Sequence, residues 1–175
     1  MPEHVIRSVE TRDVRYPLPP GAGSDAIHSE SEYSFAVTLV ALERGAYGTG
    51  IVLTLGAGNE LVCQAIELLA GTLAGSEIEE LMSDFGTVFH RLAEHPQLRW
   101  LGPHMGVVHL ALASITNACF DLWAKSRGMP LWRLLLDLTP EQIVRLLDLS
   151  YLEDVLPAET ALNILRLKLD LTGPA

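Results

Sequence analysis

Residues 106–136 read GVVHLALASITNACFDLWAKSRGMPLWRLLL, and they predict the helix around which the rest of the chain packs. The first part of this stretch is apolar on nearly every side, which is typical of a helix buried inside a domain. Asp121 and Lys125 lie four residues apart in the favourable acid-then-base order. Gly128 is expected to end this helix and Pro130 to begin the next one.

The residues before position 56 predict a small sheet. Residues 4–16 mix β-branched and charged side chains, as a half-exposed strand does, and residues 33–42 and 49–55 predict a β-hairpin. Between the first two strands, residues 18–32 read LPPGAGSDAIHSESE. A stretch rich in Pro, Gly, Ser and Asp predicts a loop, and loops of this length in a compact domain are usually functional lids or disordered.

From residue 59 onward the sequence predicts helices. Asn59 is placed to cap a helix over residues 61–74, and residues 76–79 (SEIE) predict a capping box for a helix that ends near Ala93. Residues 139–142 (TPEQ) predict a second capping box at the start of another helix. Residues 145–149 either finish that helix or begin a strand. Residues 157–166 predict a short helix. Strands followed by helices make an α+β domain: a three-stranded antiparallel sheet followed by a helical bundle.

Composition bounds the class of protein. The chain has 175 residues, 49% of them hydrophobic, and a formal net charge of −10, so one domain is expected, and nucleic acid and anionic membranes are unfavourable partners. The stretch 106–124 is long enough to suggest a membrane span, but its polar residues favour a buried helix instead. Cys63 and Cys119 lie in apolar helical contexts and are expected to be free thiols, which with a charged N-terminus predicts a cytoplasmic protein.

The polar residues form no obvious catalytic centre. His104 and His109 lack the spacing of a zinc site, and the glycines at 56 and 58 lack the third glycine of a dinucleotide fingerprint. The polar line that begins at Asn117 favours a structural network over a catalytic one. A lid-like loop without a catalytic group suggests a domain that covers another domain's active site.

Several blocks of the sequence resemble one family closely. The helix-turn-helix at 117–135 resembles the end of the capping domain in the mandelate racemase branch of the enolase superfamily, and further blocks follow the order and spacing of L-fuconate dehydratases. These blocks are RDVRYP (12–17), GSDA (23–26), EYSFAVTLV (32–40), QLRWLGP (97–103), GVVHLA (106–111) and LDLSYLEDVL (147–156). The resemblance covers roughly residues 8–166.

The resemblance implies a fold and an activity. Members of this family have an N-terminal capping domain and a modified TIM barrel that holds Mg²⁺, and they dehydrate a sugar acid after removal of the proton next to its carboxylate. By position, Gly23, Ser24, Asp25 and Tyr33 match the residues of the cap that bind the substrate. The resemblance places the capping domain at residues 1–145 and the beginning of the barrel region at residues 146–175.

After residue 166 the sequence no longer follows the family, and a TIM barrel needs about 250 residues. We therefore expect this chain to bind no metal of its own and to be inactive alone, with a barrel-containing chain or a second copy as its partner. The other interpretations are a non-catalytic module for binding or oligomerisation and a non-functional remnant.

Overall fold

The structure, a computed structural model, describes residues 4–19, 21–23, 25–27, 32–101 and 106–172, the last four of these by their backbone only. Its sheet has three antiparallel strands in the order β1 (Ile6–Pro17), β2 (Glu32–Leu42) and β3 (Tyr47–Thr54). The strand and hairpin predictions are confirmed within two residues at each end. The fold class predicted from the sequence is therefore confirmed.

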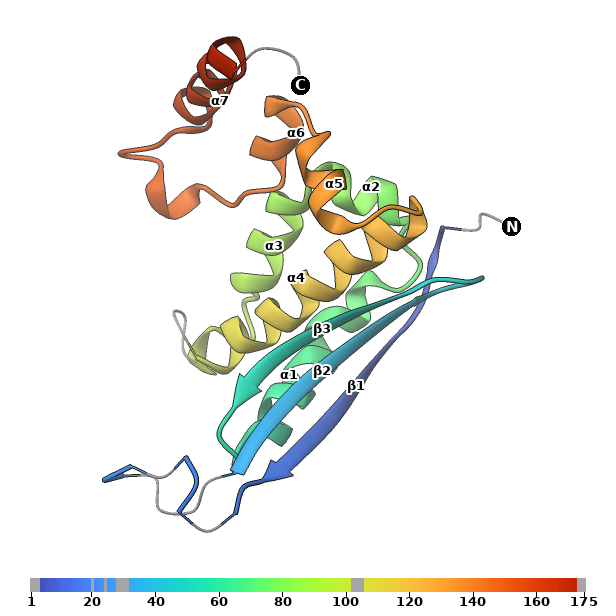
Figure 1. Ribbon diagram of the computed structural model, residues 1–175, viewed down its shortest axis with the longest axis vertical. Helices are drawn as coiled ribbons and strands as arrows, with labels where there is room; N and C mark the ends of the chain where they lie inside the picture. Colours follow the sequence, from blue (N-terminus) through green and yellow to red (C-terminus); the bar gives the residue numbers. More distant parts are fainter. Residues whose placement is uncertain (1–3, 20, 24, 28–31, 102–105, 173–175) are drawn as a thin grey trace.

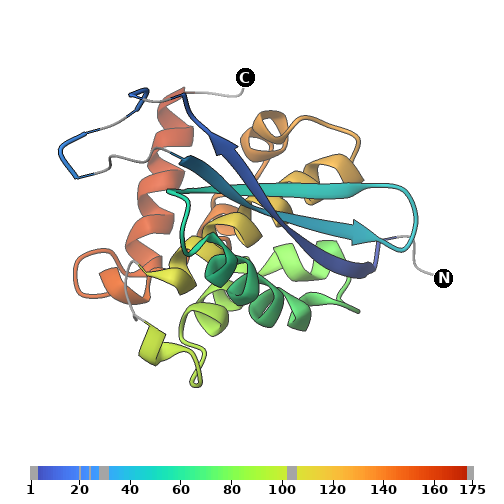
Figure 2. The ribbon, with the colours of Figure 1, turned by 90° about the horizontal axis from the view of Figure 1, so that it is seen from below.

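The helices follow the sheet in the chain and cover one of its faces (Figure 1). Seen from below, the sheet lies across one side of the helices, and the face of the sheet that points away from the helices is open (Figure 2). α1 and α4 make the contacts with the strands, and the helices after α4 lie farther from the sheet. The α-helices are α1 (Asn59–Ala70), α2 (Ile78–Ser83), α3 (Phe85–Ala93), α4 (Val107–Ser126), α5 (Leu131–Leu136), α6 (Pro140–Arg145) and α7 (Ala158–Thr172), with 3₁₀ turns at Gly71–Leu73, Arg99–Leu101 and Ser150–Leu152.

α4 is the central helix that residues 106–136 predict. Its inner face is fully buried at residues such as Ile115 and Leu122. It is long and apolar enough to cross a membrane by length and composition alone, but 56% of its most apolar window is buried inside the protein, as in the core helix of a folded domain. Cys119, on the same helix, is free, and burial raises the pKa of its thiol to about 12.

The polar residues of α4 make structural contacts. Asp121 forms an ion pair with Lys125 at 2.7 Å and accepts a hydrogen bond from the backbone N–H of Thr49 at 2.8 Å. Lys125 also donates to the backbone carbonyl of Tyr47 at 3.2 Å. Asn117, the first residue of this line, is exposed. These contacts join α4 to the beginning of β3, in agreement with the structural interpretation of this line.

Two predicted helix caps were wrong, each because a tertiary contact uses the residue. Asn59 is buried and its side chain does not cap α1, which begins after Gly58. Ser76 is not a cap because its carbonyl accepts a hydrogen bond from the backbone N–H of Ile6 at the beginning of β1. α2 begins two residues later, and the Glu77 carboxylate accepts from the N–H of Glu80 at 2.9 Å.

Other boundaries also differ. α1 ends at Ala70 and continues as a 3₁₀ turn. The helix predicted to reach Ala93 is broken at Asp84. The buried ring of Phe85, which follows the break, packs edge-on against Phe120 with 5.5 Å between the ring centroids. Gly128 has the positive φ expected of a helix end, and the capping box at Thr139 is confirmed. The residues after α6 form no strand up to the 3₁₀ turn, and α7 is longer than predicted.

Candidate functional site

The loop after β1 is closed at its base by the sheet. Strand pairing continues to the end of β1 and the beginning of β2, where Tyr16 lies opposite Tyr33 and Pro17 lies opposite Glu32. Alternate residues of a strand share a face, so Asp13 and Arg15 both point toward the helices. The base of the loop is therefore held from the inner face of the sheet.

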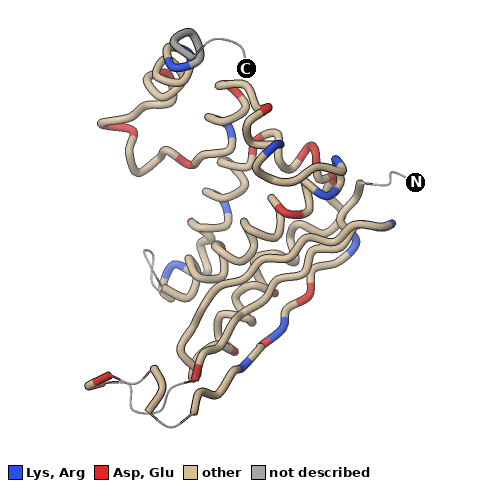
Figure 3. The backbone as a smooth tube through the Cα atoms, in the orientation of Figure 1, with Lys and Arg blue, Asp and Glu red and all other residues tan. Residues whose placement is uncertain are grey.

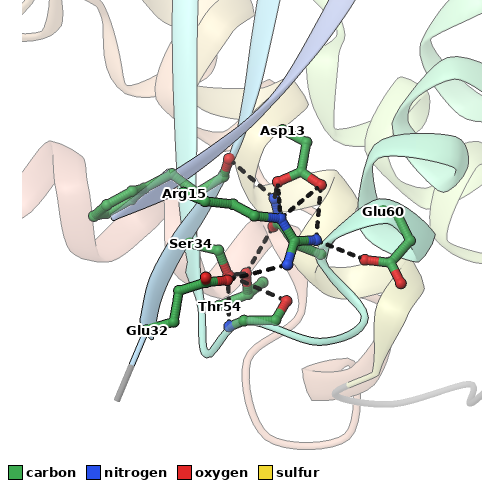
Figure 4. A network of polar contacts seen from close by, with 9 residues as sticks. Asp13, Arg15, Glu32, Ser34, Thr54 and Glu60 are labelled. Atoms are coloured by element: carbon green, nitrogen blue, oxygen red, sulfur yellow. Dashed lines mark hydrogen bonds and ion pairs between the residues drawn. The ribbon is translucent and has the colours of Figure 1, made fainter. Parts of the chain in front are cut away.

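Arg15 is the centre of a polar network at this base (Figure 4). Its guanidinium lies 2.9 Å from the carboxylate of Asp13 on the same strand and 3.0 Å from that of Glu32 at the beginning of β2. It also lies 2.9 Å from the carboxylate of Glu60 in the first turn of α1. Arg15 thereby joins the two strands that flank the loop to the first helix.

Asn59 extends this network into the core. Its amide nitrogen donates to the Asp13 carboxylate at 2.6 Å, and its amide oxygen accepts from the hydroxyl of Thr54 at 2.6 Å. Thr54 in turn lies 2.6 Å from the hydroxyl of Ser34, which accepts from the backbone N–H of Gly56. The Asn59 amide nitrogen also donates to the backbone carbonyl of Phe35 on β2 at 3.2 Å. A buried polar side chain needs such partners, so Asn59 is fixed by contacts from three strands rather than by a cap.

The contacts of the network lower the pKa values of two of its carboxyl groups. Hydrogen bonds from Arg15, and then from Asn59, hold the pKa of the Asp13 carboxyl below its usual value. The pKa of Glu60 is lowered by a hydrogen bond from its own backbone N–H and also by Arg15. Arg15 faces three carboxylates, so its charge is already neutralised by the protein. These contacts hold the end of β1 against the beginning of β2 and the first turn of α1.

The structure describes Gly23, Asp25 and Tyr33 of the predicted substrate-binding residues. Gly23 has a φ of +66° and is exposed, and the Asp25 carboxylate accepts from the backbone N–H of Ile27 at 2.7 Å. Ser24 lies outside the described residues. Tyr33 is 39% exposed and stands on the outer face of the sheet, opposite to the face that carries Arg15. The binding roles of these four residues remain a prediction.

The network around Arg15 was not predicted from the sequence. Its signal was present in the block RDVRYP, where an acid and a base two residues apart share one face of a strand. Of the two histidines weighed as metal ligands, His104 lies outside the described residues. Within the part of the chain that the structure describes, no group of three or more His, Cys, Asp or Glu residues is arranged to hold a metal ion.

Comparison with known proteins identifies the fold. No family model matches the chain. It is 40% identical to L-galactonate dehydratase from Hypocrea jecorina over 167 residues, which are 95% of this chain and 37% of that protein. The crystal structure of human mitochondrial enolase superfamily member 1 superposes with a TM-score of 0.86 at 42% identity, over 93% of this chain and 38% of that one. The fold is that of an enolase-superfamily N-terminal capping domain.

A more distant structure has the same fold. L-talarate/galactarate dehydratase from Salmonella typhimurium LT2 matches with a TM-score of 0.56 and 23% identity over 75% of this chain, a likeness that shows the fold alone. A form of that enzyme was crystallised with Mg and L-glucarate. The capping domain described here thus spans little more than a third of the length of the curated relatives that it matches.

Proposed function

We propose that this capping domain is the lid of a magnesium-dependent sugar-acid dehydratase that acts on L-fuconate or its close analogue L-galactonate. The observation that carries the proposal is the 40% identity to an L-galactonate dehydratase, which extends over 95% of the chain and so includes the loop. L-Fuconate is 6-deoxy-L-galactonate, so the two acids have the same reacting carbons and differ only at C6.

In this proposal the lid binds and orients the substrate. Gly23, Ser24, Asp25 and Tyr33 contact the hydroxyl groups of the sugar acid, and the network around Arg15 holds the base of the loop so that these contacts form in one geometry. The magnesium ion, which stabilises the enediolate when bound, is held in the resembled family by carboxylates of the barrel. In the proposal, the capping domain orients the substrate and excludes water, and it moves no proton.

A chimera tests this proposal. This chain replaces the corresponding capping domain of the human relative, to which it is 42% identical, and dehydration of L-fuconate and L-galactonate is measured with Mg²⁺. We expect turnover of at least one acid by the chimera and none by the 175-residue chain alone. A folded chimera that is inactive on both acids, when the human capping domain expressed in the same way is active, would contradict the proposal.

Two variants of the chimera test the site residues. Asp25→Ala and Tyr33→Phe are each expected to raise KM about tenfold, the loss of one good hydrogen bond, with a smaller change in kcat. The matched control is Glu43→Ala, an exposed residue in the turn between β2 and β3 at the other end of the sheet. An effect of the control equal to that of the two variants would show that the loop end has no special role.

A further inference from the structure

Within the described residues, no helix covers the outer face of the sheet (Figure 2). Residues that alternate with the buried ones point outward on each strand, and the register aligns them in rows across the sheet. Leu53, near the end of β3, is 52% exposed. The rows include Val14–Phe35–Leu53, Arg12–Val37–Ile51, Glu10–Leu39–Thr49 and Ser8–Ala41–Tyr47.

The charged residues of this face are confined to one strand. Acidic and basic residues alternate along β1, whereas β2 and β3 carry almost none between their ends (Figure 3). On the outer face, Glu10 and Arg12 are two residues apart and form an exposed ion pair at 2.9 Å. The face therefore consists of an apolar area beside one acid and one base.

This pattern is complementary to itself. Two copies can meet through their outer faces, related by a two-fold axis that lies midway between the two sheets and runs perpendicular to the strands at the level of Thr38. This axis places β1 of one copy over β1 of the other copy, in the opposite direction. Glu10 then meets Arg12 of the second copy, and Arg12 meets its Glu10. β2 and β3 face the same strands of the second copy, so that the row with Val37 and Ile51 lies over the row with Leu39 and Thr49. We propose that the outer face of the sheet is the interface of a two-fold dimer of this chain.

The size of the face indicates a weak dimer rather than a permanent one. Eight paired positions on strands about 4.8 Å apart cover a flat area on the order of 400 Å² per chain. With the relief of the side chains, the two copies bury about 1,000 Å² in total, near the lower limit for a specific interface. The dimer is therefore expected to dissociate in the micromolar range rather than to be permanent.

Charge reversal tests the proposed axis. Sedimentation of the 175-residue chain should show a mass that rises from 19.1 kDa toward twice that value with concentration. Glu10→Arg and Arg12→Glu should each weaken the dimer about tenfold or more, because like charges then face each other across the axis. An equimolar mixture of the two variants should restore it as a heterodimer, a result that the ion pair within one chain does not produce.

An apolar variant and its control complete the test. Leu53→Lys should abolish the dimer, whereas Leu68→Lys, on the exposed side of α1 with 63% exposure, should leave it intact. Circular dichroism shows whether each variant is folded. A chain that stays monomeric at about 200 µM, well above the expected dissociation constant, overturns the proposal, as does a dimer that survives Leu53→Lys. Two variants that fail to pair when mixed overturn the proposed axis.

Discussion

The contact of β3 with α4 and the attachment of the segment after α6 are built from different interactions. On β3, Gly50 lies so close to α4 that an added Cβ would meet the backbone carbonyl oxygen of Ser114 at 1.8 Å. The Ser114 hydroxyl, in turn, lies 2.7 Å from that of Thr38, and both side chains are fully buried. Here two backbones are in contact, and nothing can shift without moving the sheet or the central helix.

The segment after α6 is held mostly by polar contacts at the surface. His90 on α3 lies 3.1 Å from the carboxylate of Asp148, and Arg166 on α7 lies 2.7 Å from that of Glu141 on α6. One close approach exists, since an added Cβ at Gly86 would meet the carbonyl oxygen of Leu147 at 2.3 Å. Both distances are too short for a Cβ, so we expect the cost of adding one to depend on whether the neighbouring backbone can move.

The first prediction concerns Gly50→Ala. Because neither β3 nor α4 can yield, we expect the free energy of unfolding to fall by about 3 kcal/mol or more. Chemical denaturation measures the change. Gly71→Ala is the matched control, since an added Cβ there meets nothing within 4 Å and φ is −55°, and it should be neutral or slightly stabilising. Equal losses for both variants would show that the close approach is unimportant.

Gly86→Ala makes the same change where the neighbour is the surface segment. We expect the residues around Leu147 to move away, at a cost of about 1–2 kcal/mol to the global free energy of unfolding. Amide hydrogen exchange should become faster in the residues after α6 and stay unchanged in β3 and α4. Faster exchange throughout the sheet would mean that the two regions are not separable.

The third prediction is a pH dependence at the end of α4, where the helix meets α2. Arg127 forms an ion pair with Glu79 at 2.6 Å, and this hydrogen bond lowers the pKa of the Glu79 carboxyl below its ordinary 4.5. A lowered pKa in the folded state stabilises the protein above pH 4.5, and this contribution is lost as the pH falls through the folded-state pKa. Since the pair is partly exposed, the effect is at most about 1 kcal/mol.

Glu79→Gln tests it. The variant keeps an oxygen to accept the hydrogen bond from the Trp123 indole, which lies 3.0 Å from the carboxylate. The free energy of unfolding of the variant should therefore fall less steeply below pH 4.5 than that of the natural chain, and the two should differ most at neutral pH. Parallel curves over the whole range would contradict the prediction.

The smallest effect is expected from Glu141→Gln in the second region. The substitution removes the charge that Arg166 meets, but this pair is exposed, and exposed ion pairs contribute little. We expect no measurable change in the thermal midpoint, together with somewhat faster amide exchange in the first turns of α7. A clear fall in the midpoint would show that α7 is coupled to the core more tightly than its contacts indicate.

Local patterns predicted the elements whose cause is local. The alternation in β2, the apolar spacing of α4, the positive-φ glycine at 128 and the capping box at Thr139 each depend on residues within a few positions of one another. The loop of the candidate site was also evident from its composition. The network around Arg15 was not, because it joins β1, β2 and α1, and one sequence does not show which distant residues meet.

The sequence by itself determined that a sheet of three strands precedes a bundle of helices with an apolar helix at its centre, because periodicity and turn residues act over short range. Only the tertiary structure decided that Asn59 serves the core rather than a cap, that Ser76 pairs with β1, and that Gly50 permits a contact between two backbones. Within the described residues, the tertiary structure also leaves the outer face of the sheet without a helix over it. The physical reason is the same in each case: these roles depend on contacts between segments far apart in the chain, and only folding brings those segments together.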